Sequence, residues 1–152
     1  MKNLLFALAA MAAMAALGAC ATGASLSDNQ RLAVYRAHAG APVKSFHYFG
    51  NLHGWDSLGD SALVIWDRPN RAYLLTLAAT CPQLDFAHAI SFSGFSSQSG
   101  SVYAGFDDVV ILDRQTPSIP CRIQQIQPVD TRAIKQAEKD ARAAAQASAD
   151  ES

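Results

Sequence analysis

The chain has 152 residues, of which 50% are hydrophobic and 16% are charged, and its formal net charge is −1 at pH 7. A chain of this size can hold one domain with its own core, but not two. Because 12 basic and 13 acidic residues nearly balance and no basic run occurs, we expect no nucleic-acid partner.

The N-terminus has the pattern of a secretory signal. Lys2 precedes an uninterrupted apolar run from Leu4 to Leu17, which is shorter than the about 20 apolar residues that span a bilayer. The run ends in Leu17-Gly18-Ala19-Cys20, which resembles the lipobox of bacterial lipoproteins. This resemblance implies that residues 1–19 are removed as a signal peptide and that Cys20 carries the lipid, with palmitate-type acyl chains as the membrane anchor.

The alternative is an ordinary signal peptide that is cut near Ala19 or Ala24. In the lipoprotein interpretation, Ala21 follows the lipidated cysteine, and resemblance to the lipoprotein sorting rule then favours the outer membrane, facing the periplasm. Residues 20–26 form a short tether, and a flexible chain of that length reaches only about 15 Å. We therefore expect a domain held close to a lipid surface in the cell envelope.

A short helix is predicted to begin at Ser27. Ser27 and Gln30 have the spacing of a capping box, and Gly40 and Pro42 are predicted to end the segment. From Val43 the pattern alternates through Phe46 and Tyr48, which predicts a strand ending at Gly50. Residues 51–60, which include Trp55, are predicted to be a turn-rich connection.

The clearest element is a hairpin. Residues 62–66 and 71–78 are apolar strands, and Pro69 and Asn70 between them suit the centre of a type I turn. Leu63 and Ile65 lie on one face of the first strand, and the apolar Val64 and Trp66 lie on the other. We therefore expect the strand to be covered on both faces.

Residues 91–101 are rich in serine and glycine, which indicates a mobile loop or a wide hairpin end. Residues 102–112 contain one or two strands with a kink at Asp107-Asp108. The alternation that begins at Cys121 breaks before Ile126, which indicates a bulge near Gln124-Gln125. From Thr131 we expect an exposed polar helix with an alanine stripe, which frays into a disordered tail.

Together these elements predict an α+β, mostly β domain over residues 27–130, followed by the polar helix and tail over residues 131–152. About six strands in succession favour an antiparallel meander that curls into a small barrel or half-barrel, because consecutive strands usually pair. Cys81 and Cys121 are predicted to form a disulfide bond, since an exported domain folds in an oxidising compartment. A metal site is the competing interpretation of this pair, although their spacing fits it poorly.

The segment from Tyr35 to Asp130 resembles a family of proteobacterial lipoproteins whose shared domain has no assigned function. The matching motifs are FGNLHGWDSLGD (49–60), RPNRAYLLTL (68–77), CPQLDFAHAI (81–90), FDDVVI (106–111) and PCRIQQIQPVD (120–130). The resemblance implies a lipobox and a cysteine pair. It implies no activity and no catalytic residues.

Three patterns in the sequence are candidates for chemistry. The best metal candidates are His47, His53, Asp56 and Asp60, because imidazole and carboxylate groups are zinc ligands, but they lack the HExxH spacing. His38 and His88 are isolated in the sequence. Gly94 to Gln98 begins like the GxSxG motif of serine hydrolases and departs from it at the last position. Asp107 and Asp108 are adjacent in a predicted strand or turn, where their side chains point to opposite faces.

Several aromatic residues could line a ligand groove, although such residues more often form core. They are Phe46, Tyr48, Phe49, Trp55, Trp66, Tyr73 and Phe106. With no catalytic motif, we expect a non-enzymatic binding or structural accessory module without a cofactor, anchored to the membrane and partnered by an unidentified envelope protein. The alternative is a periplasmic small-molecule or metal-binding protein that uses residues 47–60.

Overall fold

The computed structural model describes residues 25–94, 99–112 and 119–150. The predicted signal peptide, Cys20 and the start of the tether therefore lie outside the described residues. Within those ranges the chain forms helices α2 (Asp28–Ala37) and α3 (Thr131–Asp150) and one 3-10 turn, η1 (Leu84–Phe86). The strands are β1 (Ser45–His47), β2 (Gly54–Ser57), β3 (Ala62–Arg68), β4 (Arg71–Leu77), β5 (Ile90–Ser93), β6 (Ser101–Tyr103), β7 (Asp108–Ile111) and β8 (Pro120–Val129).

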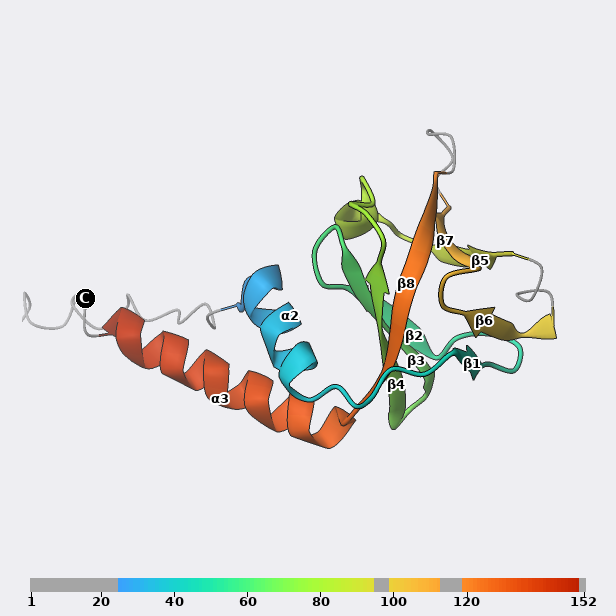
Figure 1. Cartoon of the computed structure of the whole chain (residues 1–152). Coiled ribbons are helices and arrows are strands. Elements are labelled where there is room, and N and C mark those ends of the chain that lie inside the picture. The colour runs from blue at the N-terminus through green and yellow to red at the C-terminus, as the bar shows by residue number, and fades with distance from the viewer. Residues whose placement is uncertain (1–24, 95–98, 113–118, 151–152) are drawn as a thin grey trace, which may run out of the picture.

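The main sheet has six antiparallel strands in the order β2-β3-β4-β8-β7-β5, and β1 pairs with β6 in a second, two-stranded sheet. Figure 1 shows the main sheet curled on one side of the molecule, with α2 and α3 on the other. The predicted α+β, mostly β class and the six-stranded antiparallel half-barrel are confirmed. The strand order departs from a simple meander, because β8 lies between β4 and β7.

The β3–β4 hairpin forms where it was predicted, with Pro69 and Asn70 between its strands. Its two faces are buried in two separate clusters, which we call the barrel core and the helix-side core. The barrel core fills the half-barrel and consists of Phe46, Leu63, Ile65, Leu75, Leu77, Cys81, Leu84, Val102, Val109, Ile111, Cys121, Ile123 and Ile126. The helix-side core consists of Leu32, Tyr35, Leu58, Ala62, Val64, Ala72, Leu74 and Ile134. The expected burial of both faces is confirmed.

The predicted disulfide joins Cys81 to Cys121, with the two Cα atoms 5.7 Å apart. Cys81 follows the β3–β4 hairpin, whereas Cys121 lies on β8. Both side chains belong to the barrel core. The bond therefore links the hairpin side of the sheet to its last strand, as the sequence predicted.

The predicted bulge in β8 is also confirmed. Leu77 pairs with Ile123 while the preceding Thr76 pairs with Gln125, so Gln124 is the extra residue. Ile123 and Ile126 consequently both lie in the barrel core, although they are three positions apart.

Two predictions about connections were wrong. Residues 54–57 are not a turn but strand β2, which pairs with Leu63–Trp66 of β3. Residues 91–93 belong to β5, which pairs with β7; of the predicted 91–101 loop, residues 95–98 lie outside the described part of the chain. Both strands are only four residues long and contain glycine or serine, so backbone pairing to a neighbour, rather than side-chain propensity, makes them strands.

The helices also differ in extent from the predictions. The Ser27–Gln30 capping box forms, but α2 ends at Ala37, before the predicted stop at Gly40. The C-terminal helix is less exposed than expected, because α3 contacts α2 and buries Ile134 in the helix-side core. Among the described residues, neither helix has the length and apolar composition that crossing a membrane requires.

Candidate functional site

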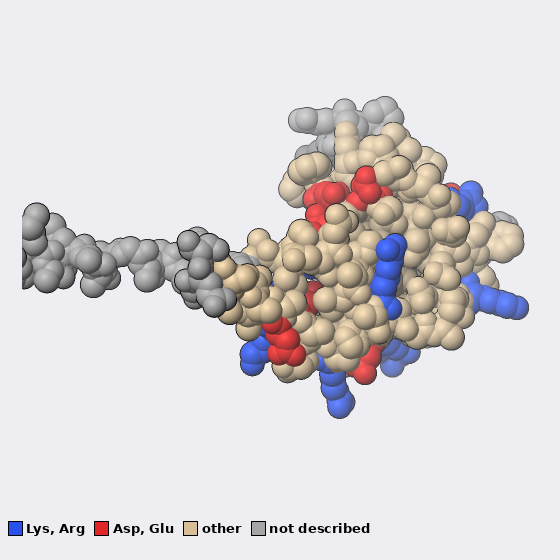
Figure 2. Space-filling model, turned by 60° about the vertical axis from the view of Figure 1, so that its left-hand side comes forward, with Lys and Arg blue, Asp and Glu red and all other residues tan. Residues whose placement is uncertain are grey.

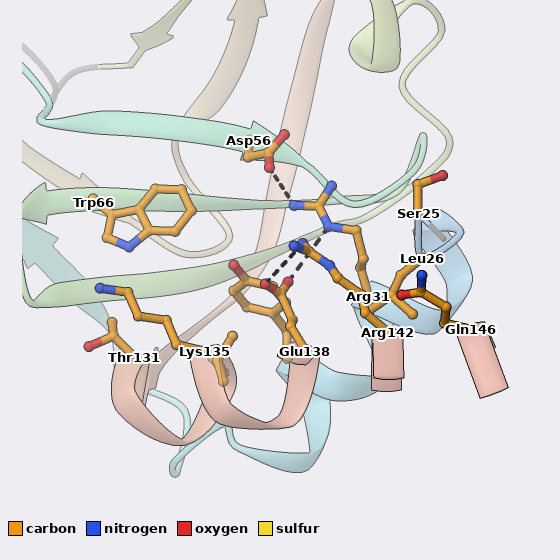
Figure 3. A pocket seen from close by; sticks show the side chains of 12 residues that line it. Ser25, Leu26, Arg31, Asp56, Trp66, Thr131, Lys135, Glu138, Arg142 and Gln146 are labelled. Carbon is orange, nitrogen blue, oxygen red and sulfur yellow. Dashed lines mark hydrogen bonds and ion pairs between the residues drawn. The ribbon is translucent and has the colours of Figure 1, made fainter. Parts of the chain in front are cut away.

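A cleft of about 710 Å³ lies between the two helices and the outer face of the sheet. We call it the helix cleft (Figure 3). Its volume lies within the range of about 300–1,000 Å³ that is usual for small-molecule sites. The cleft is lined by Ser25, Leu26, Arg31, Tyr35, Asp56, Trp66, Thr131, Ile134, Lys135, Glu138, Arg142 and Gln146.

The strands present two residues to this cleft. On β3, Leu63 and Ile65 face the barrel core, so alternation turns Trp66 to the helix side. On β2, Trp55 packs on the barrel core and the next residue, Asp56, faces the cleft. The sheet thus supplies an indole and a carboxylate to the same space.

Helix α2 contributes the central cation, Arg31. The capping box at Ser27 fixes the start of the helix, and Leu32 and Tyr35 are its buried residues. Arg31 lies beside this buried face, and its guanidinium forms an ion pair with Asp56 and donates to the carbonyl oxygen of Ser57 at 3.3 Å. Arg31 therefore ties α2 to the edge strand β2.

Helix α3 presents its charged residues at intervals of three and four positions. Asp130 precedes the helix and caps it, because its Oδ1 accepts hydrogen bonds from the backbone N–H groups of Arg132 and Ala133, each at 3.0 Å. Lys135, Glu138 and Arg142 then fall on the face that lines the cleft.

Glu138 lies between two guanidinium groups. Its Oε1 is 3.7 Å from Nε of Arg31, and its Oε2 is 3.8 Å from Nη2 of Arg142. Oε1 is buried and accepts no hydrogen bond from the described residues. Glu138 is thus held by charge attraction at a distance and lacks close donors.

Lys135 and Trp66 are among the cleft residues whose side-chain donors have no partner in the described part of the chain. Neither the Lys135 ammonium nor the Trp66 indole makes a hydrogen bond or ion pair with the residues that the structure describes. Arg142 has the distant ion pair with Glu138, and its side chain is 57% exposed. Figure 3 shows the Lys135 ammonium on the same side of the cleft as the Trp66 ring.

Burial changes two ionisation equilibria in the cleft. Burial, with the nearby charge of Glu138, raises the pKa of Tyr35 to about 12. Burial lowers the pKa of Arg31, but the hydrogen bond and charge of Asp56 outweigh it, so the net pKa is raised. Tyr35 therefore stays neutral and Arg31 stays charged at physiological pH.

The cleft has three basic and two acidic side chains, a formal excess of one positive charge. The face shown in Figure 2 also carries both basic and acidic residues, and most of its surface is uncharged. With both acids near arginines and Lys135 unpaired, the arrangement favours an anionic group in the cleft.

The four predicted metal candidates are not brought together. His47 is on β1, where its Nδ1 is hydrogen-bonded to Oγ of Ser101 at 2.7 Å. His53 precedes β2, Asp56 pairs with Arg31, and the carbonyl oxygen of Asp60 accepts from the backbone of Cys81. In the described part of the chain, no group of three His, Cys, Asp or Glu residues could hold a metal ion.

The two adjacent aspartates have different partners, whereas the sequence predicted only that their side chains point to opposite faces. Asp107 is buried and accepts a hydrogen bond from the backbone N–H of Tyr103 at 2.7 Å, whereas Asp108 forms an ion pair with Arg122 at 2.7 Å. Of the GxSxG-like segment, only Gly94 is described. Its φ of +148° and the close Asp107 carboxylate leave no room for a side chain.

The aromatic residues divide between core, cleft and surface. Phe46 is buried in the barrel core and stacks on Tyr73 with ring centroids 5.1 Å apart. Trp66 alone of the seven aromatic candidates lines the helix cleft. Phe49 and Phe106 are more than 70% exposed, so they are neither core nor part of this cleft.

Sequence reasoning missed most of the cleft. Of its charged residues, only Asp56 was singled out, and for a different role. The spacing of Lys135, Glu138 and Arg142 was a usable signal, because residues three and four apart share one helix face. Arg31 carried no signal of its own, since its partners lie 25 or more positions away.

The chain belongs to a family of unknown function, DUF6491, whose model matches residues 1–145. The match includes α2, the whole sheet and most of α3, so every charged residue of the helix cleft lies within it. The resemblance to a domain without an assigned function is thereby confirmed at the level of the family. No curated protein and no solved structure matches the chain.

Proposed function

We propose that the protein is a membrane-anchored lipoprotein of the bacterial cell envelope whose domain is a non-enzymatic binding module. In this proposal residues 1–19 are removed, Cys20 carries the lipid, and the protein is held at the outer membrane, facing the periplasm. The observation that carries the binding role is the helix cleft, which is lined by the unpaired Lys135 and by Trp66.

The disulfide bond supports export. Cys81 and Cys121 are joined in the barrel core, and structural disulfides persist mainly in oxidising compartments such as the periplasm. An exported domain of this kind is consistent with the secretory pattern from Lys2 to Cys20.

The start of the described chain supports a cleft close to the membrane. Ser25 and Leu26 line the cleft, and they follow the proposed lipid site by only five and six positions. Six residues span at most about 20 Å even in a fully extended chain. If Cys20 is acylated, the mouth of the cleft is held near the lipid head groups.

The lining of the cleft supports binding rather than covalent chemistry. It has no cysteine or histidine among the described residues, and the raised pKa of Tyr35, about 12, keeps its hydroxyl neutral. Asp56 and Glu138 lie beside arginines. These carboxylate and guanidinium groups are thus engaged with one another.

Metabolic labelling with radioactive palmitate, followed by membrane fractionation, tests the anchor. We expect label in the wild-type protein and in a Ser25→Ala control, and none in Cys20→Ser, which should leave the membrane fraction or retain its uncut signal. Equal labelling of the wild type and Cys20→Ser, or no label in either, would remove the proposed anchor.

A further inference from the structure

We infer that the helix cleft binds an organic phosphate: an oxyanion attached to an apolar body. This inference rests on the proposed binding function and adds the class of ligand. The phosphate group would come from either of two sources, a free organic phosphate in the periplasm or the head group of an anionic phospholipid.

The donors that remain unpaired select an oxyanion. The Lys135 ammonium has three N–H donors and the Trp66 indole has one, and neither is used by the described residues. The two stand on the same side of the cleft in Figure 3. A phosphate placed between them would receive charge-assisted hydrogen bonds, which are stronger than neutral ones.

Neither acidic residue of the cleft forms an ion pair with Lys135. Asp56 is paired with Arg31, and Glu138 lies between Arg31 and Arg142. Arg142 is seven residues after Lys135, or about 10 Å along the helix. It therefore adds positive potential to the cleft without being the direct partner of an oxyanion held by Lys135.

The rest of the lining requires an apolar body on the ligand. Leu26 and Ile134 border the same space as the Trp66 ring, and apolar contact adds affinity in proportion to the area removed from water. Inorganic phosphate would pair with Lys135 but leave the apolar surfaces of Leu26, Ile134 and Trp66 exposed to water. An organic phosphate fits both halves of the cleft.

Calorimetric titration of the full chain, as recovered from cells, with phenyl phosphate tests the inference. We expect saturable binding, with inorganic phosphate weaker by about tenfold and uncharged benzyl alcohol without measurable binding. Lys135→Gln should weaken the binding of phenyl phosphate by about tenfold, and Trp66→Phe should weaken it by a smaller factor. Each change removes a hydrogen bond to a charged group. Arg142→Gln should weaken the binding by about threefold.

The matched control is Lys139→Gln, which removes an exposed cation from the same helix outside the cleft. It should leave affinity within twofold of the wild type. If Lys139→Gln and Lys135→Gln weaken binding equally, the effect is general surface charge and the inferred site is overturned.

A second titration identifies the source. Trp55→Phe leaves Trp66 as the one tryptophan of the chain, so its emission reports on the cleft. The ligand is assigned to the lipid head group if the Trp66 emission shifts with vesicles of phosphatidylcholine and phosphatidylglycerol. This shift should be absent with pure phosphatidylcholine vesicles and absent in Lys135→Gln. A shift with phenyl phosphate alone assigns the ligand to a free compound.

If neither phenyl phosphate nor the anionic vesicles changes heat or emission, the ligand class is wrong. The phenyl phosphate titration does not require a lipid anchor. Binding of phenyl phosphate without palmitate labelling would thus refute the lipid anchor and support the phosphate site. Palmitate labelling without binding would support the anchor and refute the phosphate site.

Discussion

The disulfide bond should supply a large part of the stability of the domain. Cys81 and Cys121 are 40 positions apart, and closing a loop of that length removes chain entropy from the unfolded state worth about 4 kcal/mol. Typical domains are stable by only about 5–15 kcal/mol. Breaking the bond should therefore lower the melting temperature by roughly 10–20 °C for a domain of this size.

Urea unfolding followed by circular dichroism, with and without dithiothreitol, measures this contribution. Reduction should lower the unfolding free energy of the wild type by about 4 kcal/mol. The Cys81→Ala/Cys121→Ala double variant should unfold like the reduced protein and should not respond to dithiothreitol. A loss below about 1 kcal/mol on reduction would refute the loop-entropy argument. Any dithiothreitol response in the double variant would show that the reductant acts elsewhere.

Two further predictions concern the helices. Arg31→Gln should lower the unfolding free energy in urea by about 2 kcal/mol, because it leaves Glu138 without its α2 partner. The loss is smaller than for a fully buried pair because the site is partly exposed. Lys139→Gln is the neutral control, and an equal loss of stability in both variants would contradict the ion-pair network of Arg31 and Glu138. The hydrogen bond from the backbone N–H of Ala133 lowers the pKa of Asp130 in the folded protein. The Asp130 carboxylate therefore stabilises α3 fully at pH values above its unfolded-state pKa of about 3.9, and this stabilisation is lost as the pH falls through its folded-state pKa. The helical signal at 222 nm should therefore be lower in Asp130→Ala at neutral pH and converge with the wild type in acid, and parallel pH profiles would exclude this cap.

The sequence predicted those elements that local chemistry determines. The capping box of Ser27 and Gln30 needs only three residues of separation, and the Pro69-Asn70 turn is set by two residues that favour its backbone angles. The alternation of apolar residues in β3 and β4 similarly predicted burial on both faces. Each of these signals is complete within one segment of the chain.

The strands that were missed depend on partners distant in the sequence or on weak local signals. Gly54–Ser57 and Ile90–Ser93 are short and contain glycine or serine, and they become strands by pairing with β3 and β7. The placement of β8 beside β4 joins residues about 50 positions apart. Consecutive pairing is the commoner arrangement, and it correctly places β7 beside β8 but misses β4 as the second neighbour of β8.

The cleft was not predictable because its charged residues come from three elements. Arg31 lies on α2, Asp56 on β2 and Glu138 on α3. Each has the appearance of an ordinary surface residue in its own segment. Only the packing of both helices on one face of the sheet turns them into a partly buried network.

That packing depends on a single extra residue in β8. Cys121 and Ile123 face the barrel core, and with strict alternation the residue at 129 would face it too. The bulge at Gln124 shifts the phase by one, so Ile126 stays in the barrel core while Val129 packs against the helix-side core. Asp130 follows at once and caps α3. The helix therefore leaves the sheet on its outer face, where Lys135 and Trp66 line the same cleft, and the bulge that interrupts the apolar pattern is also what makes the helix cleft possible.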